Sequence, residues 1–252
     1  MTGYSIAEEY TLPSKGLVYT TKINPVIKIR SMTTEEEMKR LSKSDRQYKT
    51  MCEIIDDCLL ENPGISAYDM CIADYQFLLH RLRVVTYGSE YNTTSRCPYC
   101  ECIEYGTLDL DMLEVKECDL DEIQSLFEFT LPKTGKRIRI ALQTPRMIDD
   151  ISAHVAEDRK KSKGKAADNT FIYTLQSLIS SVDGEHLDPV KLEDFVRKLP
   201  MMDTNYIIKH AEKLVESFGV VPTVSTTCSV CGLDYTNTFR FSREFFGPTV
   251  DI

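Results

Sequence analysis

Two pairs of cysteines are the residues in this sequence whose spacing is best suited to chemistry. Each pair is a Cys-x-x-Cys motif shortly after a Thr-Thr step, and a long stretch of chain separates the two motifs. A Cys-x-x-Cys turn directs two sulfur atoms to one side, so two such turns can supply the four thiolates of a tetrahedral zinc site. Such a shell leaves no position for water. The pattern therefore predicts one structural Zn²⁺ per chain, with the ligands Cys97, Cys100, Cys228 and Cys231.

The distance between the two motifs is unusual for a zinc ribbon, in which roughly 15–20 residues separate the pairs. It is explained if each half of the chain contributes one pair, so that the metal joins the halves. Two alternatives are weaker: exposed thiol pairs without a metal are prone to oxidation, and a thioredoxin-like redox site needs a helix where this sequence predicts strands. Cys102 is a competing candidate ligand because it lies two positions after Cys100.

The other residue types suited to chemistry do not form a catalytic motif. The four histidines are scattered, there is no Gly-rich phosphate loop, and paired acids adjacent in sequence point apart on a helix. We therefore expect no enzymatic activity. The N-terminal sequence lacks the features of a signal peptide, so the nine cysteines are expected as reduced thiols. Cys52, Cys58 and Cys71 fall in apolar helical patterns and are predicted core residues.

The elements that must position the two Cys-x-x-Cys turns, called knuckles below, follow an internal repeat. The segments EYTLPSKG (9–16) and EFTLPKTG (128–135) each precede an alternating strand, a Thr-led acidic helix start and a long amphipathic helix that leads to a knuckle. Four features in the same order favour duplication over chance similarity. The sequence predicts an α+β fold, an internally duplicated unit of a β-hairpin plus helices, with the halves joined by a four-cysteine, zinc-ribbon-like knuckle pair.

The repeat divides the chain of 252 residues into two predicted domains. Residues 1–127 form the N-terminal repeat with the first knuckle, and 128–252 form the C-terminal repeat with the second knuckle and an aromatic tail. No apolar run approaches the roughly 20 residues of a membrane span, and the net charge of −9 disfavours binding to a nucleic-acid backbone. The Lys-rich run 158–168 is predicted to be a solvated loop, although it could contact RNA or an acidic partner.

The C-terminal tail is the predicted partner-binding surface. Its phenylalanines alternate or stand side by side, and so short a segment is not expected to hide all of them. The residues predicted to bind a partner are Phe239, Phe241, Phe245, Phe246 and Pro248. The alternative, in which these side chains pack on the second repeat, stays open.

Several longer segments resemble one protein family. LPSKGLVY followed by TTEEE, and DYQFLLHRLRVVTYGSEY leading into CPYC, are similar to the N-terminal half of the baseplate hub proteins of T4-like bacteriophages. VDGEHLDPVKLEDFVRKLPMMDTNYI, leading through CSVCG to FRFSREFFGP, resembles their closing half. The resemblance implies a non-enzymatic protein that serves in the hub of a contractile tail. The expected partners are other hub or tape-measure proteins and a second copy of the chain, without nucleic acid or membrane.

Two other functions stay open at this point. Related tail proteins act as assembly chaperones that are absent from the mature virion, which implies action in the host cytoplasm during assembly rather than residence in the baseplate. A zinc-ribbon regulator that binds nucleic acid is the alternative of a different class, and the acidic charge of the chain weighs against it.

Overall fold

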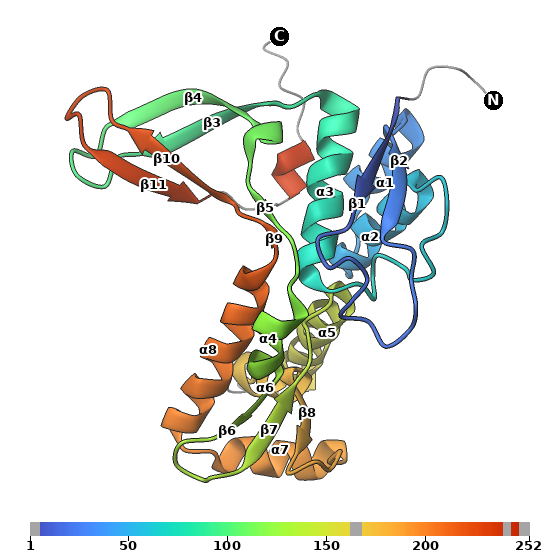
Figure 1. Cartoon of the computed structure of the whole chain (residues 1–252), viewed down its shortest axis with the longest axis vertical. Coiled ribbons are helices and arrows are strands. Elements are labelled where there is room, and N and C mark those ends of the chain that lie inside the picture. The colour runs from blue at the N-terminus through green and yellow to red at the C-terminus, as the bar shows by residue number, and fades with distance from the viewer. Residues whose placement is uncertain (1–5, 162–167, 239–242, 247–252) are drawn as a thin grey trace.

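The computed structural model describes residues 6–161, 168–238 and 243–246, and the chain folds as an α+β protein (Figure 1). Its strands are β1 (Ala7–Thr11), β2 (Val26–Arg30), β3 (Glu90–Arg96), β4 (Ile103–Asp109), β5 (Val115–Lys116), β6 (Glu128–Thr130), β7 (Arg137–Ile140), β8 (Ile179–Val182), β9 (Gly219–Val220), β10 (Thr223–Thr227) and β11 (Asp234–Thr238). Its helices are α1 (Thr34–Leu41), α2 (Gln47–Cys58), α3 (Ile72–Tyr87), η1 (Leu110–Met112), α4 (Leu120–Phe127), α5 (Pro145–Lys161), α6 (Thr170–Leu178), α7 (Pro189–Lys198), α8 (Met201–Ser217) and η2 (Arg243–Phe246).

Both halves of the chain begin with an antiparallel hairpin. β1 pairs with β2 and β6 pairs with β7, and each connecting turn contains the Leu-Pro segment that is repeated in the sequence. In each half two helices follow the hairpin, α1 and α2 in the first and α5 and α6 in the second, and the chain then pairs with the second strand of that hairpin. In the first half Leu59 forms an isolated bridge to Ile29, and in the second half β8 pairs with β7. Each half then continues into a long helix, α3 or α8.

The two Leu-Pro turns are held in the same way. Asp74, in the first turn of α3, accepts hydrogen bonds from the amide (3.0 Å) and hydroxyl of Ser14. Asp203, in the first turn of α8, accepts from the amides of Lys133 (2.8 Å) and Thr134 (3.0 Å). Both aspartates are buried, which is tolerated because their oxygens are hydrogen-bonded. Each long helix is thereby tied to the hairpin of its own half.

Helix starts predicted from Thr-led acidic segments are found in the structure. The Thr33 hydroxyl accepts from the amide of Glu35, and the Glu36 carboxylate accepts from the amide of Thr33 at 2.7 Å, which completes a capping box at α1. The hydroxyl of Thr144 accepts from the amide of Met147 at the start of α5. The TTEEE and TPRM segments therefore begin helices as their residue types indicate.

Two hydrophobic cores hold the body of the protein together. The first surrounds α3, and the second lies between the sheet β6–β7–β8 and the helices α6 and α8. Each core also takes residues from the opposite half: Val220 and Phe245 belong to the first, and Cys71 and Cys118 belong to the second. The division into domains at residues 127 and 128 stays a prediction. No helix in the described ranges is both long and apolar enough to cross a membrane.

The halves also meet in a short strand pair. β5 pairs with β9, so that the segment after the first knuckle lies beside the segment that leaves α8. Gly219 occupies this crossing with a φ of 109°, and a Cβ added there would lie 3.0 Å from the Cβ of Ala73 on α3. Glycine is therefore required both by the backbone conformation and by the close approach of α3.

The aromatic tail differs from its prediction. Phe245 and Phe246 in η2 are each only 1% exposed and belong to the first core, where the Phe245 ring lies 5.2 Å from that of Tyr91. The expectation of exposed phenylalanines is wrong for these two residues, and they pack on the first half rather than the second. The reason is long-range: the chain returns from β11 to a slot beside α3 (Figure 1). Phe239, Phe241 and Pro248 lie outside the described residues.

A buried arginine fixes this returning segment. The guanidinium of Arg83, on α3, donates to the carbonyl oxygens of Gly88 (2.8 Å), Glu90 (3.3 Å) and Phe245 (3.1 Å). Arg83 is fully buried, and burial lowers the pKa of its guanidinium. Since a buried cation must be compensated by hydrogen bonds, the carbonyl of Phe245 completes a site that the first half alone leaves incomplete.

Candidate metal centre

The two knuckles lie at the tips of two hairpins that project from the body as one arm (Figure 1). β3 and β4 enclose the first knuckle, and β10 and β11 enclose the second. The amide of Cys97 donates to the carbonyl of Cys102 at 3.0 Å, and the amide of Cys228 donates to the carbonyl of Leu233 at 3.0 Å. Each hairpin is therefore closed by a backbone hydrogen bond directly beside its first cysteine.

The backbone turns in the same way after each second cysteine. Glu101 has a φ of 62° and Gly232 has a φ of 71°, both in the left-handed region. Their amides donate to the carbonyls of Cys97 (3.0 Å) and Cys228 (2.9 Å) respectively. The turn brings the two sulfur atoms of a knuckle to one side of the chain. Glycine meets this conformation without strain, whereas glutamate does not.

The structure brings together the four cysteines that the sequence predicts. Their sulfur atoms all lie within 4.8 Å of one another, with Cys97 3.7 Å from Cys231 and Cys100 3.5 Å from Cys228. Four thiolates around a tetrahedral zinc, with bonds of about 2.3 Å, have sulfur atoms about 3.8 Å apart. The spacing fits, and both hairpins contribute two atoms. The four cysteines could therefore hold a metal ion.

The environment of the knuckles favours thiolates at two of the four positions. The amide of Cys231 points at the Cys228 sulfur at 3.4 Å and is the main cause that lowers the pKa of Cys228 to about 6. The backbone amide of Cys102 lowers the pKa of Cys100. Because the thiolate is the form that binds metals, these amide donors prepare the knuckles for a cation.

A fifth thiol lies beside the four. The sulfur of Cys102 is 3.3 Å from that of Cys100 and 3.3 Å from that of Cys228. Cys102, Glu104 and Cys228 form a second group whose ligand atoms are mutually close enough to hold a metal ion. The competition by Cys102 that the sequence left open is thus geometrically possible.

Glu104 is a residue of this site that the sequence analysis missed. Its carboxylate, on β4, accepts from the amide (3.0 Å) and the hydroxyl (2.8 Å) of Ser229 in the second knuckle. The Ser229 hydroxyl is the main cause of the lowered pKa of Glu104. Ser95 and Tyr235 form a second link between the hairpins, with 2.7 Å between their hydroxyl oxygens. No spacing rule identifies such contacts, because the partners lie far apart in sequence.

The cysteines and histidines described next are buried or packed within the fold. Cys52, Cys58 and Cys71 are buried, as predicted from their helical patterns. His80 is fully buried on α3 with its Nε2 2.9 Å from the carbonyl oxygen of Leu110, and His210 on α8 stacks on a phenylalanine ring. Residues 158–161 of the Lys-rich run form the end of helix α5 rather than the predicted loop, and residues 162–167 lie outside the described part.

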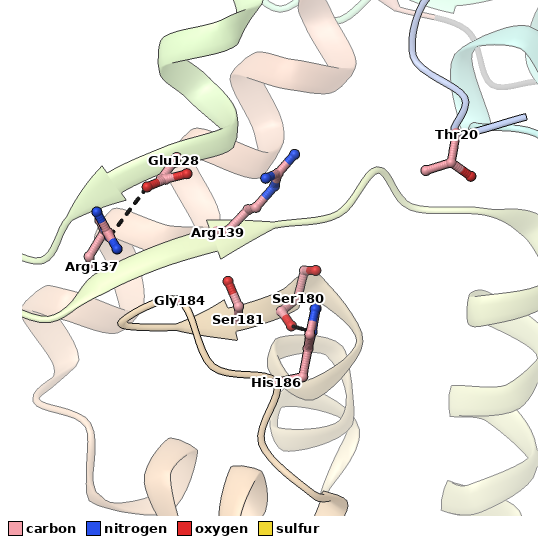
Figure 2. A pocket seen from close by; sticks show the side chains of 8 residues that line it. All are labelled: Thr20, Glu128, Arg137, Arg139, Ser180, Ser181, Gly184 and His186. Carbon is pink, nitrogen blue, oxygen red and sulfur yellow. Dashed lines mark hydrogen bonds and ion pairs between the residues drawn. The ribbon is translucent and has the colours of Figure 1, made fainter.

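A pocket lies beside the sheet β6–β7–β8, and its lining also includes Thr20 of the first half (Figure 2). It encloses about 380 Å³ and is lined by Thr20, Glu128, Arg137, Arg139, Ser180, Ser181, Gly184 and His186. Arg137 forms an ion pair with Glu128 at 3.3 Å, and Nδ1 of His186 lies 2.7 Å from the carbonyl oxygen of Ser180. The sequence gives no indication of this pocket because its lining comes from four separate segments.

A model of the family described as T4 bacteriophage base plate protein matches residues 6–247. The chain belongs to this family. The match spans both knuckles and both hairpins, and it confirms the predicted relation to T4-like baseplate proteins. No curated protein and no solved structure matched the chain.

Proposed function

We propose that this protein is a non-enzymatic structural subunit of the hub in the baseplate of a contractile phage tail. The observation that carries the proposal is the family match, which covers residues 6–247 and therefore nearly the whole chain. The protein acts through its surfaces, and its partners are other baseplate hub or tape-measure proteins. It is assembled in the host cytoplasm and then stays in the virion.

The metal in the knuckle pair is proposed to be zinc. Four cysteine sulfurs from two turns are a donor set typical of structural Zn²⁺, and a full shell leaves no site for a substrate. Cys97 and Cys228 are buried, whereas Cys100 and Cys231 are exposed, so each knuckle contributes one inner and one outer ligand. The ion would join the two hairpins into one arm, and its binding energy would be folding energy of that arm.

A duplicated origin for the two halves is part of the proposal. It is supported by the order hairpin, helices, long helix and knuckle-bearing hairpin, which occurs twice. It is also supported by two details that the order alone does not require: an aspartate of the long helix holds each Leu-Pro turn, and a residue with positive φ follows each knuckle. β8 and α7 extend the second half beyond the first.

The arm offers the clearest surface for protein contacts. Large apolar side chains are exposed around the two knuckles: Tyr99 (61%), Ile103 (59%), Tyr105 (80%), Val230 (71%) and Leu233 (49%). Exposed apolar residues gathered at one end of a protein are typical of an interaction site. Since the arm projects from the body, another subunit can contact it without displacing either core (Figure 1).

The composition of purified mature particles tests the proposed role. We expect the protein to be present at a fixed ratio to the other baseplate proteins when particles are quantified by mass spectrometry. Its absence from mature particles, together with its presence in assembly intermediates, would instead identify an assembly chaperone that acts before the tail is complete.

A further inference from the structure

The pocket beside the sheet β6–β7–β8 contains an arginine with no described partner. Arg139 lies in the middle strand, directly between Glu128 on β6 and Ser181 on β8 in the strand register. The Glu128 carboxylate nevertheless pairs with Arg137, at 3.3 Å. Within the described ranges no ion pair or hydrogen bond of the Arg139 guanidinium is found, and Figure 2 shows it pointing away from that pair.

This lack of a partner sets Arg139 apart from the other described arginine side chains. Each of the others forms an ion pair with a carboxylate or, for the buried Arg83, hydrogen bonds with carbonyl oxygens. The chain has 39 acidic residues and a net charge of −9. Arg139 is solvent-exposed at this pocket and has no carboxylate partner in the described ranges, so its guanidinium is accessible to an external anion.

The rest of the lining fits an oxyanion. Ser180 and Ser181 bring hydroxyl donors from β8, and the His186 ring is held in place by its Nδ1 contact with the carbonyl of Ser180. An arginine fork binds a carboxylate with two parallel hydrogen bonds. These donors come from one sheet and its following turn.

The net charge of the residues that line the pocket favours a carboxylate over a dianionic phosphate. Arg137 and Arg139 carry two positive charges and Glu128 carries one negative charge, so the three together have one net positive charge. One carboxylate neutralises this charge, whereas a dianionic phosphate exceeds it. The volume of about 380 Å³ is larger than a carboxylate group, so a side chain with some of its backbone can enter.

We propose that this pocket binds a glutamate or aspartate side chain in an acidic segment of another tail protein, with the Arg139 guanidinium as the principal contact. The choice of a protein partner rests on the proposed function. The carboxylate chemistry rests on the lining alone, so the two can fail separately.

The binding test uses the full-length protein and a fluorescently labelled peptide with two adjacent glutamates, followed by fluorescence anisotropy. We expect the wild type to bind this peptide and to reject the matched peptide with two glutamines. Arg139→Gln should weaken binding at least about tenfold, because it removes a charge-assisted hydrogen bond to the carboxylate. Glu128→Gln should tighten binding because it removes the competing carboxylate.

The matched control is Arg197→Gln, which removes the same charge from an exposed ion pair on α7. It should bind the glutamate peptide like the wild type. Equal affinity of Arg139→Gln and Arg197→Gln, or equal binding of the two peptides, would overturn the proposal. Stronger competition by inorganic phosphate than by acetate would assign the pocket to a phosphoryl group instead. Presence of the protein in particles together with no peptide binding would reject the pocket while leaving the structural role intact.

Discussion

Substitution of Cys228 by serine should locally unfold the two hairpins of the arm, β3–β4 and β10–β11, while the body stays folded. Cys228 is the cysteine whose sulfur contacts those of both Cys100 (3.5 Å) and Cys102 (3.3 Å) of the other hairpin. Its loss opens the metal shell and removes the central contact between the knuckles. Because the ligands come from both halves, the variant should loosen β3 and β4 as well as β10 and β11.

The magnitude follows from what else holds the arm. Its own core consists of Cys97, Cys228 and Tyr235, with Cys102 packed against them. A structural zinc in a small domain contributes on the order of 10 kcal/mol. The contacts that remain between the hairpins, Glu104 with Ser229 and Ser95 with Tyr235, are hydrogen bonds that are together much weaker than a metal shell. Without the metal, the knuckle ends of the two hairpins therefore lose most of their support, whereas Tyr91, Leu108 and Val224 still pack the other ends against the first core.

Hydrogen exchange and metal analysis measure this effect. We expect one zinc per wild-type chain, and in Cys228→Ser a loss of metal and of amide protection in residues 90–109 and 223–238, with α3 still protected. Val230→Ser, in the same knuckle and 71% exposed, is the matched control and should behave like the wild type. Wild-type protein without bound metal, or a Cys228→Ser variant with full protection of β3 and β4, would refute the reasoning.

Three further predictions test other parts of the structure. Cys100→Ser should keep one metal per chain because Cys102 can replace it, whereas Cys97→Ser and the double variant of Cys100 and Cys102 should lose the metal, as judged by cobalt spectra. Burial lowers the pKa of His80 from 6.5 to about 4, so on acidification the unfolded state takes up a proton before the folded state does. The free energy of unfolding should therefore fall as the pH drops from 6.5 towards 4. Urea titrations of His80→Gln should show a weaker dependence of the unfolding free energy on pH. Phe245→Ala should cost about 3–5 kcal/mol of unfolding free energy in the same assay, because it empties a buried site, and an unchanged stability would contradict the burial.

Local signals in the sequence predicted the elements that carry the site. The Cys-x-x-Cys motifs, the hairpin around each Leu-Pro turn and the capping segment at Thr33 all depend on residues close together in the chain, and all are found. The four cysteines could be paired across the chain because metal chemistry requires four ligands. In the sequence analysis, the need for four ligands was the only argument that placed residues far apart in the chain next to one another.

The rest depends on contacts for which the sequence has no comparable rule. Phe245 is apolar and near the end of the chain, and nothing local indicates whether its slot lies in the first half, the second half or a partner. Glu104 and Arg139 are charged strand residues like many others, and only their neighbours give them a role. Their partners are fixed by the crossing of the halves, which follows from packing over the whole chain.

The exchange of residues between the two cores bears on how the protein is made. Val220, Phe245 and Phe246, which complete the first core, are synthesised more than a hundred residues after the other buried members of that core, which lie between Leu12 and Leu113. A nascent chain that stops before residue 243 leaves an open apolar slot beside α3 and the Arg83 guanidinium without its third carbonyl. The first core is therefore complete only after residues 243–246 have been synthesised, so a chain that stops before them carries an exposed apolar defect.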